Sequence, residues 1–193
     1  MVPPAALEEY RALRATIRAR GSLRVTLALV SVSLWALLAA TVEWAAARTM
    51  AWLLPLVVLG LGADIVGALH IGVERIGRYL QVEYEATDPA GPHWEHVAMA
   101  SGASQPRGGL QPLFTGWFAC AVLTNWLLAA PAGTLPLQAL LLMAHGAVLL
   151  RLWWYRQFAQ TQRQRDLQHF TQIRAARRRA EACNSDVPPS PVA

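Results

Sequence analysis

MAWLLPLVVLGLGADIVGALHI, residues Met50–Ile71, contains a single acidic side chain, Asp64. A helix of about 20 apolar residues crosses the ~30 Å hydrocarbon core of a bilayer, and this stretch is long enough to do so. Three other stretches are similarly apolar: Arg24–Trp44, Leu113–Pro131 and Leu135–Tyr155. Backbone groups in lipid need hydrogen-bond partners within their own segment, which favours helices as the spanning element. The sequence therefore predicts an all-α integral membrane protein with four transmembrane helices arranged as two hairpins.

The rest of the chain consists of segments too short to form a separate domain. With 193 residues, four spans leave room for one loop and two tails but not for a soluble domain of ordinary size. The apolar period of the second span continues to about Glu85, so we expect one long helix there, followed by a linker rich in Pro and Gly. The segments outside the spans are 1–22, the loop 72–112, an Arg- and Gln-rich helix at 156–182 and a disordered tail at 183–193.

The distribution of arginine predicts the orientation in the membrane. All 17 basic residues are arginine, and they are concentrated in 1–22, 72–112 and 156–182 but sparse in the two short links between spans. Cytoplasmic segments of membrane proteins carry the excess of basic residues, so both termini are expected in the cytoplasm. A composition rich in alanine and without lysine is typical of GC-rich bacteria. It predicts the inner (plasma) membrane of a bacterium as the location.

The N-terminal segment 1–22 has two interpretations. Its apolar side chains recur at helical spacing, with arginines on another face: Leu7, Tyr10, Leu13 and Ile17. Such an amphipathic helix is suited to lie on the anionic inner leaflet, but a solvated leader that only sets the topology has the same pattern. Gly21 and Ser22 predict a bend before the first span.

Small residues crowd the second span at helical spacing: Gly60, Ala63, Gly67 and Gly72. Small side chains one helical turn apart let a neighbouring helix approach closely. We therefore expect this face of the second span to pack against another helix.

Polar residues within the spans form the first candidate site. At a rise of 1.5 Å per residue, Asp64 lies about 20 Å from the outer end of its span, His145 about 15 Å and Arg151 about 24 Å. Ionisable groups in hydrocarbon are costly and usually face a partner. These three predict either a buried pair that fixes which helices pack or a proton or ion relay. Asn125 in the third span is expected to form an interhelical hydrogen bond.

Histidines near the inner surface form the second candidate site. His70 and Glu74 are one helical turn apart, and His93 and His96 follow the proline residues of the loop. Imidazole and carboxylate are ordinary ligands of zinc and iron, but the spacing is not that of a metalloprotease helix. Polar residues beside lipid head groups account for the same pattern. No cofactor is predicted, and zinc or iron held by these four residues is kept as an alternative.

Four arginines cluster in the tail helix: Arg174, Arg177, Arg178 and Arg179. They are suited to the anionic lipids of the inner leaflet or to a partner protein. Nucleic acid is not expected as a partner, because the chain has no recognisable nucleic-acid-binding motif.

Three functions remain open on the sequence alone. The favoured one is a non-enzymatic accessory, scaffold or regulatory subunit that docks a protein partner or a second copy through its cytoplasmic helices, since no catalytic motif stands in a credible context. The second is a small oligomeric transporter or channel that uses Asp64 with His145 or Arg151. The third is a metal-dependent membrane enzyme that uses the His70, Glu74, His93 and His96 cluster.

Overall fold

The computed structural model describes residues 4–45, 49–86, 94–98, 110–130 and 134–185. All the secondary-structure elements in these ranges are helical, which confirms the all-α expectation. In chain order they are α1 (Pro4–Trp44), the 3-10 turn η1 (Thr49–Trp52), α2 (Leu53–Leu80), the π-helical turn η2 (Gln81–Glu85), a short helix at 94–98, α4 (Leu110–Ala129) and α5 (Leu135–Ser185).

Three helical segments are long and apolar enough to cross a membrane: Pro4–Trp44, Met50–Glu85 and Leu135–Cys183. Helix α1 has 41 residues, so at 1.5 Å per residue it is about 60 Å long, roughly twice the ~30 Å hydrocarbon core. A large part of such a helix therefore extends beyond the thickness of the core. The remaining predicted span falls on α4, whose apolar part, Leu113–Ala129, is shorter than the other three segments.

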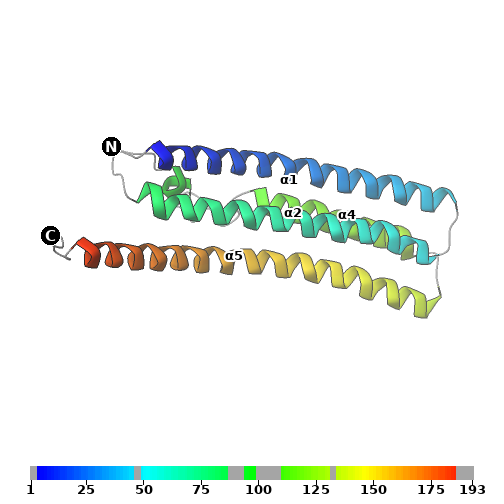
Figure 1. The fold of residues 1–193 in the computed structure, drawn as a ribbon. Helices are drawn as coiled ribbons and strands as arrows, with labels where there is room; N and C mark the ends of the chain where they lie inside the picture. The colour runs from blue at the N-terminus through cyan, green and yellow to red at the C-terminus, as the bar shows by residue number, and fades with distance from the viewer. Residues whose placement is uncertain (1–3, 46–48, 87–93, 99–109, 131–133, 186–193) are drawn as a thin grey trace, which may run out of the picture.

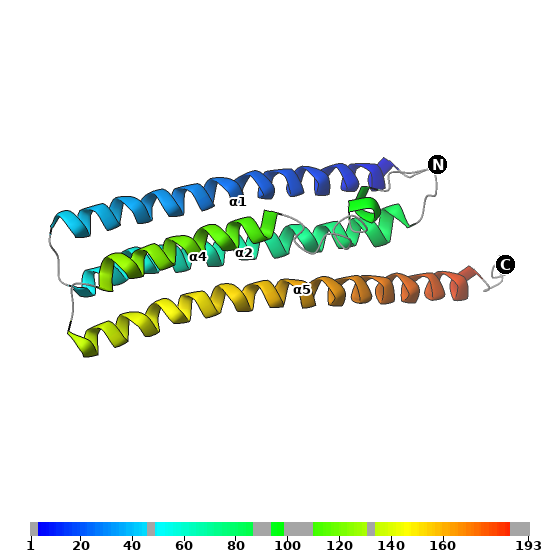
Figure 2. The ribbon, with the colours of Figure 1, turned by 180° about the vertical axis from the view of Figure 1, so that it is seen from behind.

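The helices lie side by side in an elongated bundle, with the start of α1 and the end of α5 at the same end (Figure 1). Helix α4 runs along only the opposite half of the bundle (Figure 2). We call the half that contains α4 the apolar half. We call the other half the polar half; it consists of residues 4–20, 72–85, 94–98 and 157–185.

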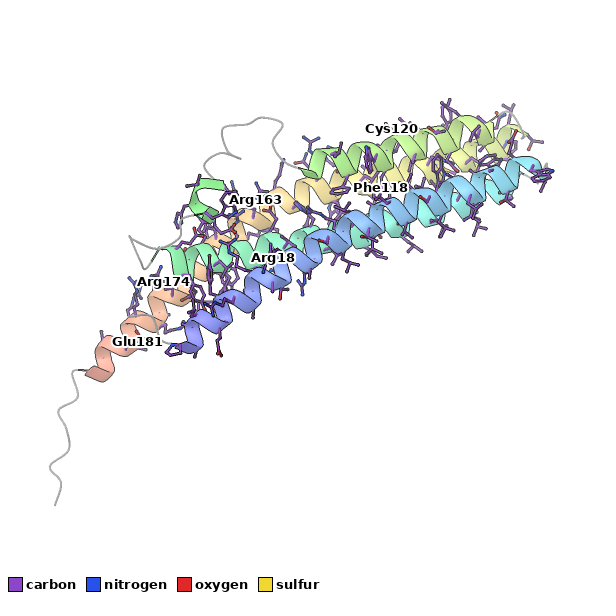
Figure 3. All side chains as sticks on the ribbon, turned by 90° about the horizontal axis from the view of Figure 1, so that it is seen from above. Arg18, Phe118, Cys120, Arg163, Arg174 and Glu181 are labelled. Carbon is purple, nitrogen blue, oxygen red and sulfur yellow. The ribbon has the colours of Figure 1, made fainter. Side chains whose placement is uncertain are left out.

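Side chains from all four helices form the core of the apolar half. Phe118 of α4, Leu59 of α2 and Ala28 of α1 are almost fully buried, and Leu152 of α5 belongs to the same cluster. Phe118 points from α4 toward the other helices (Figure 3). Because lipid is as apolar as these side chains, close van der Waals packing holds such helices together.

Helices α1 and α2 approach each other closely at a glycine that the small-residue pattern does not include. A Cβ atom on Gly62 would lie 2.3 Å from the Oγ atom and 2.5 Å from the Cβ atom of Ser31. The Ser31 Cβ is fixed to the backbone of α1, so rotation of the hydroxyl cannot relieve this clash. Gly62 therefore sets how near α1 and α2 come.

The predicted small residues of α2 lie in three environments. Gly60 and Gly67 face α5, where a Cβ would meet Val148 at 3.8 Å and the Tyr155 ring at 3.3 Å. Ala63 is buried in the core of the apolar half. Gly72 faces the guanidinium end of Arg20 on α1. The expected close packing is thus divided between two neighbouring helices.

Helix α1 continues through Gly21 and Ser22 without the bend that the sequence predicts. Its N-terminal part is held against the second long helix, because Glu9 accepts a hydrogen bond from Tyr79 and Arg14 contacts Glu85. These contacts are made only if α1 stays straight.

Aromatic rings connect the three long helices of the polar half. Tyr84 of η2 lies 5.4 Å from Tyr10 of α1 and 6.2 Å from Tyr79 of α2, between ring centroids, and Tyr79 lies 5.6 Å from Phe170 of α5. Burial and the hydrogen bond to Glu9 raise the pKa of Tyr79 to about 12. The phenol therefore keeps its proton, and with it this hydrogen bond, across the physiological pH range.

Gly62→Ala should lower the free energy of unfolding in detergent by about 1–3 kcal/mol, the usual cost of overpacking. Gly60→Ala is the matched control on the same helix, because its Cβ would make only an ordinary van der Waals contact with Val148, at 3.8 Å. This control should be neutral or stabilise by up to about 1 kcal/mol through helix propensity. Adding Ser31→Gly should recover much of the Gly62→Ala loss in a double-mutant cycle. Equal effects of the two alanines, or no coupling to Ser31, would show that the close approach is not there.

Candidate functional site

A polar network crosses the apolar half and joins α1, α4 and α5 to the turn η1 that precedes α2. Asn125 of α4 is fully buried; its Oδ1 accepts a hydrogen bond from Trp35 Nε1 of α1 at 3.0 Å. Its Nδ2 donates to the carbonyl of Trp52 at 3.2 Å and lies 2.9 Å from Nε2 of His145 on α5. The predicted interhelical role of Asn125 corresponds to this network, and Trp35 is a member that the sequence pattern gave no reason to single out.

The hydrogen bonds of this network determine which ring nitrogen of His145 carries the proton. Its Nδ1 lies 2.7 Å from the carbonyl oxygen of Leu141, which can only accept, so Nδ1 carries the proton and Nε2 accepts from Asn125. A second proton, on Nε2, would face the NH₂ group of Asn125, which cannot accept it, because the Asn125 oxygen accepts from Trp35. His145 is therefore built in as a neutral structural group.

Asp64 of α2 and Arg151 of α5 form an ion pair. Arg151 Nε lies 2.7 Å and 2.9 Å from the two carboxylate oxygens of Asp64, and its guanidinium lies over the Tyr155 ring at 5.4 Å. The side chains are 27% exposed for Asp64 and 54% for Arg151. The pair thus lies at the surface of α2 and α5, whereas the hydrogen bonds of His145 go to Asn125 and Leu141. The structure brings together two of the three residues of the predicted relay.

Glu74 ties α2 to α5 in the polar half. Its carboxylate accepts hydrogen bonds from Arg163 Nε of α5 at 2.7 Å and from Arg78 Nη2 of its own helix at 3.2 Å. Burial alone would raise the pKa of Glu74, but Arg163 and its other cationic neighbours more than offset this, and the pKa lies below its ordinary value. Arg163 lies between α5 and α2 (Figure 3).

Glu85, the last residue of η2, contacts both α1 and the start of the short helix 94–98. Its side chain is fully buried; it forms an ion pair with Arg14 at 3.3 Å, and its Oε2 lies 3.0 Å from Nδ1 of His96. It also accepts from the backbone N–H groups of Glu95 and His96 at 2.9 Å and 3.0 Å. A carboxylate at a helix N-terminus is favoured by the helix dipole. The sequence pattern gives no sign of this centre, because Glu85 and Glu95 meet Arg14 only through the tertiary fold.

The residues of the predicted metal site have separate partners where the structure describes them. His70 Nδ1 lies 2.6 Å from Arg24 Nη1, Glu74 faces arginines, and His96 faces Glu85. His93 lies outside the described residues. Within the described ranges, no group of three or more His, Cys, Asp or Glu side chains is placed to hold a metal ion. Zinc or iron at this site stays a prediction.

The tail arginines divide into two sets. Arg174 Nη1 donates to the carbonyl of Val82, and Arg177 Nη1 lies 3.4 Å from Glu83, so both are joined to η2. Arg178 and Arg179 are exposed. Only the second pair is therefore available in full to a partner or a lipid surface.

Comparison with protein-family models, with curated proteins and with solved structures finds no match to this chain. Its chemistry is defined by three features: a closed polar network, an ion pair at the bundle surface and a cross-linked polar half.

Asn125→Ala should destabilise the bundle, because it leaves the Trp35 N–H and the buried Nε2 atom of His145 without their partner. The expected loss is about 1–3 kcal/mol, measured as the free energy of unfolding in a mixed-detergent titration. Thr124→Ala is the control: Thr124 is exposed and bonds only to the Cys120 carbonyl of its own helix. Equal unfolding curves for the two variants would contradict a structural role for the network.

Proposed function

We propose that this chain is a non-enzymatic scaffold or accessory subunit of a bacterial inner membrane, which docks a protein partner through its polar half. In this proposal the four helices of the apolar half cross the membrane and both termini lie in the cytoplasm. The support is the presence of three long apolar segments and the arginine-rich segments at the same end of the bundle. Such segments stay on the cytoplasmic side of membranes.

One observation carries the proposal: α1, the α2–η2 helix and α5 continue past the apolar half and are cross-linked there. Arg163 of α5 pairs with Glu74, Arg177 of α5 with Glu83, and Arg14 of α1 with Glu85. An extension of this kind holds α5 in a defined position up to Arg177. A docking segment that continues from a fixed helix loses less conformational entropy on binding than a flexible tail does.

The end of α5 provides the docking surface. Beyond the Arg177–Glu83 contact, residues 178–183 are exposed throughout, and Glu181 lies past Arg174 at the projecting end of the helix (Figure 3). We name residues 178–183 the α5 arm. It carries Arg178 and Arg179, so its partner is expected to present an acidic protein surface, and charge complementarity of this kind raises the rate of association.

Transport is the second candidate, and the Asp64–Arg151 pair is the observation in its favour. Arg151 is half exposed in a single copy, although an ionisable group facing hydrocarbon is costly. A second copy packed over α2 and α5 would enclose the pair and line a polar path. Solute flux through reconstituted protein would then depend on Asp64.

Docking is tested by chemical cross-linking in native membranes, followed by sizing of the complex on a native gel. The wild-type chain should form a discrete complex. The double variant Arg178→Glu/Arg179→Glu should lose most of it, because two arm charges are reversed. The double variant Arg11→Glu/Arg20→Glu is the control, since it reverses two exposed arginines of α1 in the same half of the bundle and should keep the complex.

An isolated wild-type monomer would contradict the proposal. Equal loss of the complex in both double variants would also contradict it, because docking would then depend on net charge and not on the α5 arm.

A further inference from the structure

All four long helices line a cavity of about 40 Å³ at the junction of the apolar and polar halves. Arg24 contributes from α1, His70 from α2, Thr115 from α4 and Arg156 from α5. Apolar side chains close its other side: Ala63, Val66, Phe118 and Leu152. A single water needs roughly 10–15 Å³ on this measure, so the cavity has room for one small polyatomic group and not for a whole lipid or nucleotide.

Arg24 is the unusual residue of this cavity. Its side chain is buried, with the residue only 9% exposed, and its Nε is buried without a hydrogen-bond partner. Its Nη1 lies 2.6 Å from His70 Nδ1, and its guanidinium lies over the Phe114 ring at 5.2 Å. Arginine can only donate, so His70 Nδ1 accepts and the imidazole is neutral. The contact with His70 therefore supplies no negative charge, and Glu74 attracts Arg24 electrostatically without forming an ion pair with it in the described residues.

Arg156 adds a second positive charge to the same cavity. The ion pairs among the described residues join other arginines to the carboxylates, and neither Arg24 nor Arg156 takes part in one. A buried charge without an ion-pair partner is unfavourable. The cavity is lined by two arginines, one buried and one exposed, and it therefore forms a site for an anion.

We infer that this cavity binds a phosphate group, with the rest of the phosphate-bearing molecule outside it. Guanidinium groups bind phosphate through paired, charge-assisted hydrogen bonds. The cavity also lies where the predicted spans end, at Arg24, Ile71 and Tyr155. Basic pockets between helices at the cytoplasmic surface bind anionic head groups, so a lipid or a soluble phosphate ester can supply the group.

The site is independent of the proposed docking function, because the α5 arm does not line the cavity. Loss of phosphate binding and loss of the partner complex would therefore appear in different variants.

The test measures thermal unfolding of the purified full chain in a neutral detergent, titrated separately with phosphatidylglycerol, phosphatidylcholine and inorganic phosphate. Binding should raise Tm by mass action. A rise with phosphatidylglycerol that exceeds the rise with phosphatidylcholine identifies a lipid head group as the source. A rise with inorganic phosphate alone identifies a soluble phosphate. Either result supports the site only if it depends on the two arginines.

Arg156→Gln should weaken binding about tenfold or more, the effect of losing one charge-assisted hydrogen bond, and its exposed position should leave the fold intact. Arg24→Gln should abolish binding. Arg165→Gln is the matched control, because Arg165 is exposed on α5 outside the cavity, and it should bind like wild type. The inference is overturned if no probe raises Tm, if Arg156→Gln binds unchanged, or if Arg165→Gln weakens binding equally.

Discussion

Carboxylates on the central helix determine how the long helices are arranged. Glu74, Glu83 and Glu85 lie within four turns of the α2–η2 helix, and each faces an arginine of α1 or α5. An exposed ion pair contributes little by itself. Glu74 and Glu85 are not exposed, however, and a buried carboxylate is tolerated only where donors surround it. The acidic central helix therefore selects arginine-bearing neighbours and fixes their register.

This constraint accounts for features far from the ion pairs. Helix α1 stays straight through Gly21 because Arg14, two turns before it, must reach Glu85. Arg174 and Arg177 become part of the bundle, which leaves the α5 arm as an exposed basic segment at the end of α5. At the junction of the two halves the pattern changes: Arg24 contacts His70 of α2 and, among the described residues, forms no ion pair with a carboxylate. The cavity with unpaired positive charge lies at this point.

The sequence predicts the features that depend on local composition. Long apolar stretches became helices, and the depths of Asp64 and Arg151 were sufficient to place them at one level. The sequence did not predict which neighbouring helix each side chain faces, because this depends on how each helix is rotated about its own axis. Gly60 and Gly62 are two residues apart, so they point to nearly opposite faces, and only the tertiary fold shows that Gly62 meets Ser31. His145 resembled a relay residue until Asn125 and Leu141 accounted for both of its nitrogens.

Hydrogen exchange of the backbone amides, measured in lipid nanodiscs, tests most directly whether the polar half is a folded extension. The α5 arm provides the internal reference for an unpacked helix in water. The account predicts that amides in 73–80 and 157–174 exchange much more slowly than those of the arm, because packed helices open only through larger unfolding events. Exchange of 73–80 and 157–174 as fast as that of the arm would contradict it, since the carboxylates of α2 and η2 would then not hold the three helices together.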